Sequence, residues 1–317
     1  MNRRIVKAVL SKKFNEWVNS IHDTALQEAV RKNTIITGGA IVSLLMNEKV
    51  NDFDIYFTNF ETLKLVAEYY VNEFKKLHSI EGSQCGRNIN PFIQSDGNRV
   101  RIQINSVGIA GEKTPESQYR FFEGRPLEEG EDYVAGIMQD ILTDADGLDG
   151  EELDKIEKEK YRPVFMTSNA ITLSNQIQLI VRFCGNADEI HKNYDFVHCT
   201  NYWESDGGKL TLRPEALESI LAKELRYVGS LYPVCSFIRV RKFIKHGWHI
   251  NAGQMLKICL QLSELDLCDV NVLEDQLTGV DTAYFLQVID YLRERQQKEP
   301  DFHIHVPYLI SIIDKIF

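Results

Sequence analysis

Two glycines and two aspartates lie close together near the start of the chain. Gly38 and Gly39 follow the segment TIIT, and after twelve intervening residues Asp52 and Asp54 flank one phenylalanine. On a strand, side chains two residues apart point to the same face, so these carboxylates would repel each other unless a cation or a proton lay between them. The spacing therefore predicts a site for Mg²⁺, a hard cation that prefers oxygen ligands.

The glycine pair is typical of a turn that lets a phosphate approach the backbone. A strand that enters this turn and leaves as a helix directs backbone N–H groups toward the helix N-terminus, and glycine places no Cβ in the way. The segment GGAIVS lacks the lysine of a Walker A loop and the spacing of a dinucleotide fingerprint. With the two aspartates, the turn predicts a triphosphate site with two Mg²⁺ ions. Ser43, in the following helix, is either a phosphate ligand or a surface serine.

Apolar periodicity predicts the elements that carry these residues. Helical periodicity runs over residues 4–31, a short strand enters the glycine turn, a helix leaves it, and the alternating segment DFDIYF is a strand. A long helix follows, with Thr58-Asn59 as its cap. Further strands are predicted at 98–108, 170–174, 176–183 and 195–203, and a short helix capped by Asn186 at 186–194.

The order of elements predicts an α+β fold in two domains. Residues 1–210 form the first, which carries the glycine turn and the aspartates, and residues 211–317 form a mostly helical C-terminal domain. Residues 111–162 are strongly acidic and predict a solvated insertion in the first domain. Asp149 takes the place of the invariant glycine of an EF-hand loop, which argues against calcium binding of that type.

The composition is that of a globular protein without a membrane span. The net charge is −10, six scattered cysteines form no C-x-x-C pair, and no apolar stretch approaches the ~20 residues that cross a bilayer. Polar residues interrupt the basic N-terminus too often for a signal peptide. We therefore expect a cytoplasmic protein with reduced thiols and no membrane contact.

The segment from Thr34 to Phe57 resembles the DNA polymerase β-like nucleotidyltransferase superfamily. Its motif is a glycine pair followed by two acids that flank one apolar residue, and Gly38-Gly39, Asp52 and Asp54 match it. The resemblance implies a mixed sheet flanked by helices, a glycine turn that holds the triphosphate of an incoming nucleotide, and two acids that bind Mg²⁺. The CCA-adding branch has an Arg-Asp pair after the glycines, where this chain has VS. The run from QIQLIVRF to YDFVHC is similar to a segment of viral and ankyrin-linked members.

The resemblance also implies a third acid on a later strand. Gln103 occupies the expected place on the predicted strand 98–108, so that strand does not supply it. Asp195, which opens the predicted strand 195–203, is the candidate, and the alternative is a turn aspartate between a helix and a strand. The predicted catalytic acids and metal ligands are thus Asp52, Asp54 and Asp195.

The stretch between residues 213 and 249 is locally basic and interleaved with aromatic residues. This mixture suits a nucleotide base or single-stranded nucleic acid. Arg226, Arg239 and Lys242 are the candidate nucleotide-binding cations, the last two on one helix face. The alternative is a solvated basic face over an aromatic core.

These features predict a Mg²⁺-dependent, template-independent nucleotidyltransferase that moves a nucleoside monophosphate from an NTP to an acceptor hydroxyl. The basic C-terminal half favours an RNA 3′ end, such as that of tRNA, as acceptor; a protein side chain, modified by AMP transfer, and a small molecule stay open. Gln103 favours a second interpretation, a catalytically degenerate nucleotide sensor. A third is a protein-interaction module that uses the acidic insertion. The similarity to viral members would place the protein in the host cytoplasm.

Overall fold

The computed structural model describes residues 2–78, 91–96, 99–103, 109–110, 160–277, 283–299 and 302–316. The chain divides into two compact units. Among the described residues, the first unit holds those up to residue 192 together with 198–220, and the second holds residues 193–197 and those from 221 onward. The main division falls within helix α9 (Pro214–Ala222), a little after the predicted boundary at 210/211.

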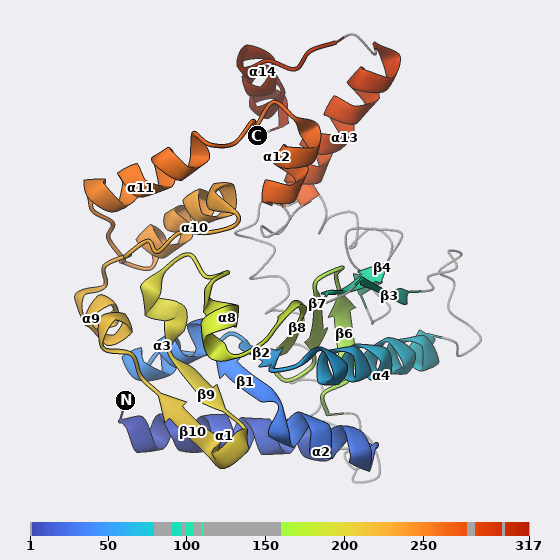
Figure 1. Ribbon diagram of the computed structural model, residues 1–317, viewed down its shortest axis with the longest axis vertical. Coiled ribbons are helices and arrows are strands. Elements are labelled where there is room, and N and C mark those ends of the chain that lie inside the picture. Colours follow the sequence, from blue (N-terminus) through green and yellow to red (C-terminus); the bar gives the residue numbers. More distant parts are fainter. Residues whose placement is uncertain are drawn as a thin grey trace, which may run out of the picture. The chain divides into compact units, whose positions relative to one another are not determined.

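A mixed eight-stranded sheet forms the centre of the first unit (Figure 1), in the order β10-β9-β1-β2-β8-β7-β6-β5. Its strands are β1 (Thr34–Thr37), β2 (Phe53–Phe57), β5 (Ile109–Ala110), β6 (Pro163–Met166), β7 (Ala170–Leu173), β8 (Ile177–Cys184), β9 (Tyr202–Glu204) and β10 (Lys209–Thr211). Strands β2 and β8 are parallel, and all other neighbours are antiparallel. Strands β3 (Phe92–Asp96) and β4 (Arg99–Gln103) form a separate hairpin.

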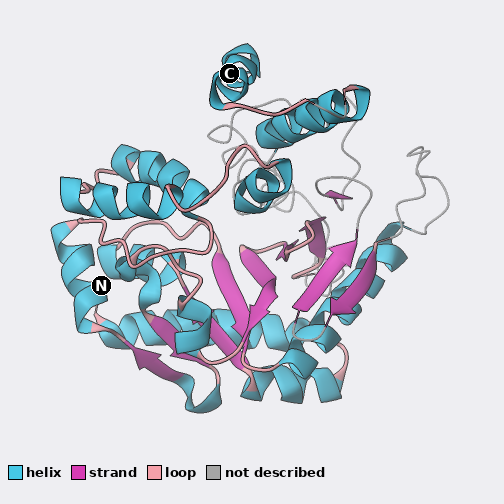
Figure 2. Cartoon of the chain, turned by 45° about the horizontal axis from the view of Figure 1, so that its top comes forward, coloured by secondary structure: helices cyan, strands magenta, loops and turns pink. Residues whose placement is uncertain are grey.

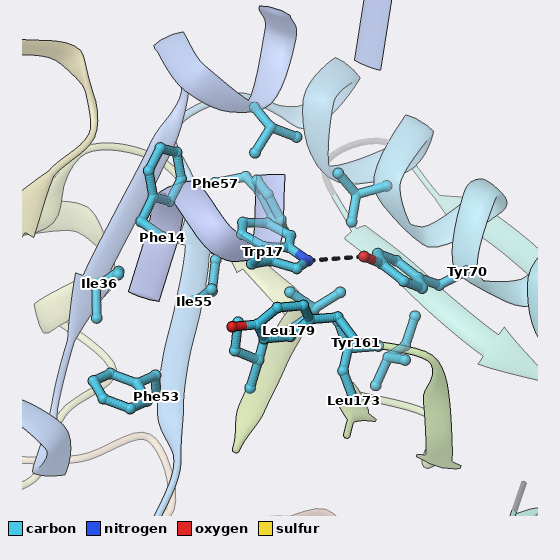
Figure 3. Packing of buried hydrophobic residues seen from close by; sticks show 14 of the residues in the cluster. Phe14, Trp17, Ile36, Phe53, Ile55, Phe57, Tyr70, Tyr161, Leu173 and Leu179 are labelled. Atoms are coloured by element: carbon cyan, nitrogen blue, oxygen red, sulfur yellow. Dashed lines mark hydrogen bonds between the residues drawn. The ribbon is translucent and has the colours of Figure 1, made fainter. Parts of the chain in front are cut away.

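Three helices cover one face of this sheet (Figure 1 and Figure 2): α1 (Arg3–Ser20), α2 (Thr24–Lys32) and α4 (Phe60–His78). Their apolar side chains and those of the strands form one continuous core. Within it the Trp17 indole N–H donates to the Tyr70 hydroxyl at 2.8 Å, as Figure 3 shows. This bond satisfies the polar group of a fully buried indole.

Capping side chains set where these helices begin. Asp23 accepts a backbone N–H in the first turn of α2, which is why the predicted helical stretch 4–31 forms two helices. Asn59 caps α4 in the same way, and Asn186 and Glu189 form a capping box at α8 (Ala187–His191). Both predicted caps, Asn59 and Asn186, are confirmed.

The two faces of the sheet differ in chemistry. Alternate residues of β2 and β8 are buried in the core: Phe53, Ile55, Phe57, Ile177, Leu179 and Val181. The residues between them, including Asp54 and Gln178, point to the opposite face because side chains alternate along a strand. Helix α3 (Gly39–Met46) leaves the sheet at the end of β1.

The second unit is helical, with α10 (Pro233–Lys245), α11 (Ala252–Leu262), α12 (Val270–Leu277), α13 (Ala283–Lys298) and α14 (Val306–Ile316). Helix α11 buries Ile258, and its Gln254 and Gln261 hydrogen-bond to Tyr227 and Ser230. Its Leu256 and Leu260 are 58% and 59% exposed. None of the helices in the described ranges is long and apolar enough to cross a bilayer.

The predicted fold class, α+β with a mixed sheet flanked by helices and a helical C-terminal part, is confirmed. One predicted strand is wrong in part, and another is confirmed where the structure describes it. Of 195–203 only β9 is a strand, because residues 197–200 form a 3₁₀ helix. Of 98–108, residues 99–103 form strand β4 of the separate hairpin, and residues 98 and 104–108 lie outside the described residues. The acidic insertion 111–162 also lies outside them, apart from its last three residues.

Candidate functional site

The glycine turn forms as predicted and leaves one of its glycines open. Gly38 has φ 89°, a region that favours glycine, and its N–H donates to the Cys199 carbonyl at 3.2 Å. Gly39 is exposed at the first position of α3, and a Cβ added there would meet nothing within 4 Å. The first N–H groups of α3 have no partner within the helix. The turn therefore presents backbone donors to an open space.

Strand pairing brings Asp54 to this turn. In the antiparallel register of β1 and β2, Asp54 lies opposite Thr37, the residue before Gly38. Facing Cα atoms in such a pair are about 4.5–5.5 Å apart, so the half-buried carboxylate stands beside the turn. Asp52 is exposed and immediately precedes the strand, which begins at Phe53. The structure thus brings the predicted aspartates and glycines together at one end of the sheet.

A polar row continues from Asp54 across the sheet. Gln178 on β8 is in register with Asp54, and Thr172 on β7 is in register with Gln178. In-register neighbours share a face, so Thr37, Asp54, Gln178 and Thr172 line the face opposite the core. The Gln178 side chain is half-buried and has no hydrogen-bond partner among the described residues.

Buried polar contacts hold Thr37 in place. Its hydroxyl lies 2.8 Å from His191 Nε2, 2.8 Å from the Asn201 carbonyl and 3.3 Å from the Cys199 carbonyl. The single hydroxyl proton goes to a carbonyl oxygen, so His191 Nε2 is the donor to Thr37. This network fixes the end of β1 and, with it, the position of Gly38.

His191 is a neutral base in this setting. Burial, and secondarily the nearby charge of Arg213, lower the pKa of its imidazole to about 4. Arg213 lies over the Tyr202 ring, 5.6 Å from its centroid, and forms an ion pair with Asp188. The Tyr202 and His191 rings meet edge to face at 5.7 Å. Through its ion pair with Asp188, Arg213 is held beside the Tyr202 and His191 rings.

The other predicted site residues belong to the second unit. Asp195 lies in a bend, and its buried carboxylate accepts from Arg239 at 2.6 Å. Arg226 contacts Glu224 at 3.3 Å. Lys242 is exposed on α10, one turn after Arg239. Two residues predicted for separate roles, the third acid and a nucleotide-binding cation, thus pair with each other, and their proposed roles in binding remain predictions.

The donor set in the first unit fits a Mg²⁺ ion that arrives with a triphosphate. Such ions are usually held by one or two carboxylates together with phosphate oxygens, and Asp52 and Asp54 are two carboxylates beside an open glycine turn. In the described part of the chain, no group of three or more acidic, histidine or cysteine side chains could hold a metal without a ligand's help. Ser43 is half-buried in the second turn of α3, where its role as a phosphate ligand stays a prediction.

The sequence analysis missed three residues of this region: Gln178, His191 and Tyr202. The alternation in QIQLIVRF would have placed Gln178 on a polar strand face, but only the pairing of β2 with β8 shows which aspartate it neighbours. Nothing local in sequence marks His191 or Tyr202, since their partners are far away along the chain.

Comparison with protein families matches residues 8–223 to one family, described as Gabija anti-defense 2 family protein. The match covers the glycine turn, both aspartates and the whole described sheet. A comparison with curated proteins gave no significant match. Because the family match spans well over half of the chain, the chain belongs to the Gabija anti-defense 2 family.

Proposed function

We propose that this protein binds an NTP with Mg²⁺ at the glycine turn and transfers the nucleoside monophosphate to an acceptor hydroxyl. The observation that carries the proposal is the register of β1 and β2, which sets Asp54 beside Gly38-Gly39 at the open N-terminus of α3. A helix N-terminus with exposed N–H groups favours phosphate, and adjacent carboxylates favour the cation that accompanies it.

Each group has a defined part in this proposal. The N–H groups of the first turn of α3 would bind phosphate oxygens, and Gly39 would let them approach. The carboxylates of Asp52 and Asp54 would hold Mg²⁺. When bound, Mg²⁺ offsets triphosphate charge and lowers the pKa of an attacking hydroxyl. The acceptor hydroxyl gives its proton to solvent as its oxygen bonds to the α-phosphorus and the bond to pyrophosphate breaks. We propose an RNA 3′ end as acceptor, with Arg226 and Lys242 among the cations that contact nucleic acid.

The two glycines provide the first test, because their roles in folding differ. Gly39→Ala should leave the free energy of unfolding unchanged or raise it by about 0.5–1 kcal/mol, since alanine favours a helix and meets no neighbour. The same change should weaken ATP binding at least tenfold if phosphate approaches there. Gly38→Ala should cost about 1–3 kcal/mol, because φ 89° strains any other residue. Unchanged ATP affinity in folded Gly39→Ala would contradict the proposal.

Labelling tests the chemistry. The full chain would be incubated with each α-labelled NTP, Mg²⁺ and either total RNA or total protein. We expect label in one acceptor class, lost in Asp54→Asn and kept in Glu28→Gln, which removes an exposed carboxylate from α2. Label in protein would support AMP transfer in place of RNA extension. Equal labelling by the Asp54→Asn protein would show that another site acts.

A specific observation favours a second function, nucleotide sensing without transfer. Gln103 lies in a separate hairpin, Gln178 stands next to Asp54 where a further acid would be useful, and Asp195 is paired with Arg239. A protein of this kind would bind ATP, would lose that binding in Gly39→Ala, and would transfer label to no acceptor.

The family description names an action against the Gabija defence. We propose that this chain has that action in the host cytoplasm, and that it depends on the nucleotide site. Virus yield would be counted in cells that carry the Gabija system, with and without the protein. The wild-type protein and Glu28→Gln should restore infection, and Asp54→Asn should not. Restoration by Asp54→Asn would separate the anti-defence action from the nucleotide site.

A further inference from the structure

The polar row across the sheet decides how many carboxylates meet at the proposed nucleotide site. Asp54 has two neighbours in register, Thr37 on one side and Gln178 on the other. The Thr37 hydroxyl is engaged by His191 and the Asn201 carbonyl. The half-buried Gln178 amide has no hydrogen bond within the described structure and shares the face of Asp54. It is therefore the side chain that is placed to meet a ligand at Asp54.

The chemistry of an amide differs from that of a carboxylate at this position. A glutamine oxygen can ligate a hard cation but contributes no negative charge. Two Mg²⁺ ions on a triphosphate bring four positive charges close together, and Mg²⁺ gives up its hydration water reluctantly. The polar row contains one carboxylate, Asp54, and the exposed Asp52 just before β2 adds a second. Two negative charges are enough for one Mg²⁺ ion and leave little for another.

We infer that Gln178 completes a one-ion site: Asp52 and Asp54 hold a single Mg²⁺ that comes with the triphosphate, and Gln178 supplies a neutral polar contact where a third acid would recruit a second ion. The inference rests on the proposed function, since it concerns ligands of the same site. It replaces the two-ion expectation and gives Gln178 the role of limiting the number of metal ions.

Manganese ions provide a direct count, independent of any activity. The full chain would be saturated with a non-hydrolysable ATP analogue and titrated with Mn²⁺, and free Mn²⁺ would be measured by electron paramagnetic resonance. The wild-type protein should bind one Mn²⁺ per bound nucleotide. Gln178→Glu, which has nearly the same shape, should bind a second ion or bind the first about tenfold more tightly. Gln178→Met should retain one ion with weaker affinity.

A matched control is available at a second half-buried glutamine of the first unit. Gln103 hydrogen-bonds to Gln94 at 2.7 Å in the β3–β4 hairpin. Gln103→Glu adds the same charge and should leave the ion count and affinity unchanged. Asp195→Asn is a test and not a control: a third metal ligand at Asp195 would lose an ion, whereas the one-ion site expects an unchanged count, with circular dichroism confirming that the variant is folded.

Three results would overturn the inference: two ions in the wild-type protein, no change in Gln178→Glu, or loss of an ion in Asp195→Asn. Failure of the proposed function has a different signature, because Asp54→Asn would then bind Mn²⁺ and nucleotide as well as the wild-type protein does. If Asp54→Asn loses the ion while the Gln178 variants behave like the wild-type protein, only the assignment of Gln178 is wrong.

Discussion

Acidification should weaken the first unit through one buried histidine. The pKa of His191 is lowered from 6.5 to about 4, chiefly by burial, so the folded protein holds the imidazole neutral where the unfolded chain protonates it. The stability contributed by the neutral ring is fully present above pH 6.5 and is lost as the pH falls toward 4.

The size of the loss follows from the two pKa values. At pH 5, protonation of the histidine in the unfolded chain raises the unfolding equilibrium constant by a factor of about 30, which lowers the free energy of unfolding by about 2 kcal/mol. His191→Gln keeps a donor near the position of Nε2, so the contact with Thr37 can be retained without a group that titrates. The variant should lose about 2 kcal/mol less than the wild-type protein between pH 7.5 and pH 5.

Urea unfolding at the two pH values measures this difference. Trp17 and Trp203 report on the first unit, and a Trp248→Phe background removes the fluorescence of the second. His22→Gln is the matched control, because His22 is exposed in the connection before α2 and the same chemical change is made there outside the buried network. Equal acid sensitivity in the His191→Gln and wild-type proteins would refute the assignment of a buried neutral histidine.

Three further predictions concern the cores of the two units. Tyr70→Phe should cost about 1–3 kcal/mol in urea unfolding, because it leaves the buried Trp17 indole N–H without its acceptor, while the apolar contacts stay. Lys13 is half-buried, with its ammonium 5.4 Å from each of two ring centroids, and its pKa is lowered to about 8, chiefly by burial. The charged side chain therefore lowers the free energy of unfolding fully below pH 8, and this loss disappears as the pH rises from 8 to 10.5. Lys13→Met should therefore stabilise by about 1 kcal/mol at pH 7, allowing for solvent screening, and a gain that persisted at pH 11 would argue against this cause. In α11, Gln261→Ala should lower the thermal midpoint because it removes the hydrogen bonds to Ser230, whereas Leu256→Ala should leave the midpoint nearly unchanged because Leu256 is exposed. A larger effect of Leu256→Ala would show that another surface covers this leucine.

Local chemistry explains which features the sequence predicts. A glycine at φ 89°, a side-chain cap and a strand of alternating polarity each depend on a few neighbouring residues, so the glycine turn, the Asn59 and Asn186 caps and β2 are all predictable. The segment 195–203 alternates like a strand, yet the Cys199 carbonyl bonds to the Gly38 N–H and the stretch around it winds into a 3₁₀ helix. Tertiary hydrogen bonds override the local pattern there.

The site residues divide in the same way. Asp52 and Asp54 stand out because their spacing is local, whereas the Asp195–Arg239 pair joins residues 44 positions apart. A basic helix predicts that Arg239 is available for a nucleotide, and only the fold shows a buried carboxylate beside it. Gln178 is similar: its polarity is visible in the sequence, but its neighbour depends on which strand pairs with β2.

The position of Asp54 beside the glycine turn follows from the packing of the opposite face of the sheet. Ile36, Ile55 and Leu179 lie side by side in the core, one residue along from Thr37, Asp54 and Gln178. A slip of one residue between β1 and β2 would turn the carboxylate into that core and the isoleucine out of it, and an unpaired buried carboxylate costs far more than any strand pairing returns. The apolar residues therefore select the register, and the register in turn aligns the acid, the amide and the turn. Substitutions in the core that loosen this register should impair nucleotide binding without touching any residue of the site.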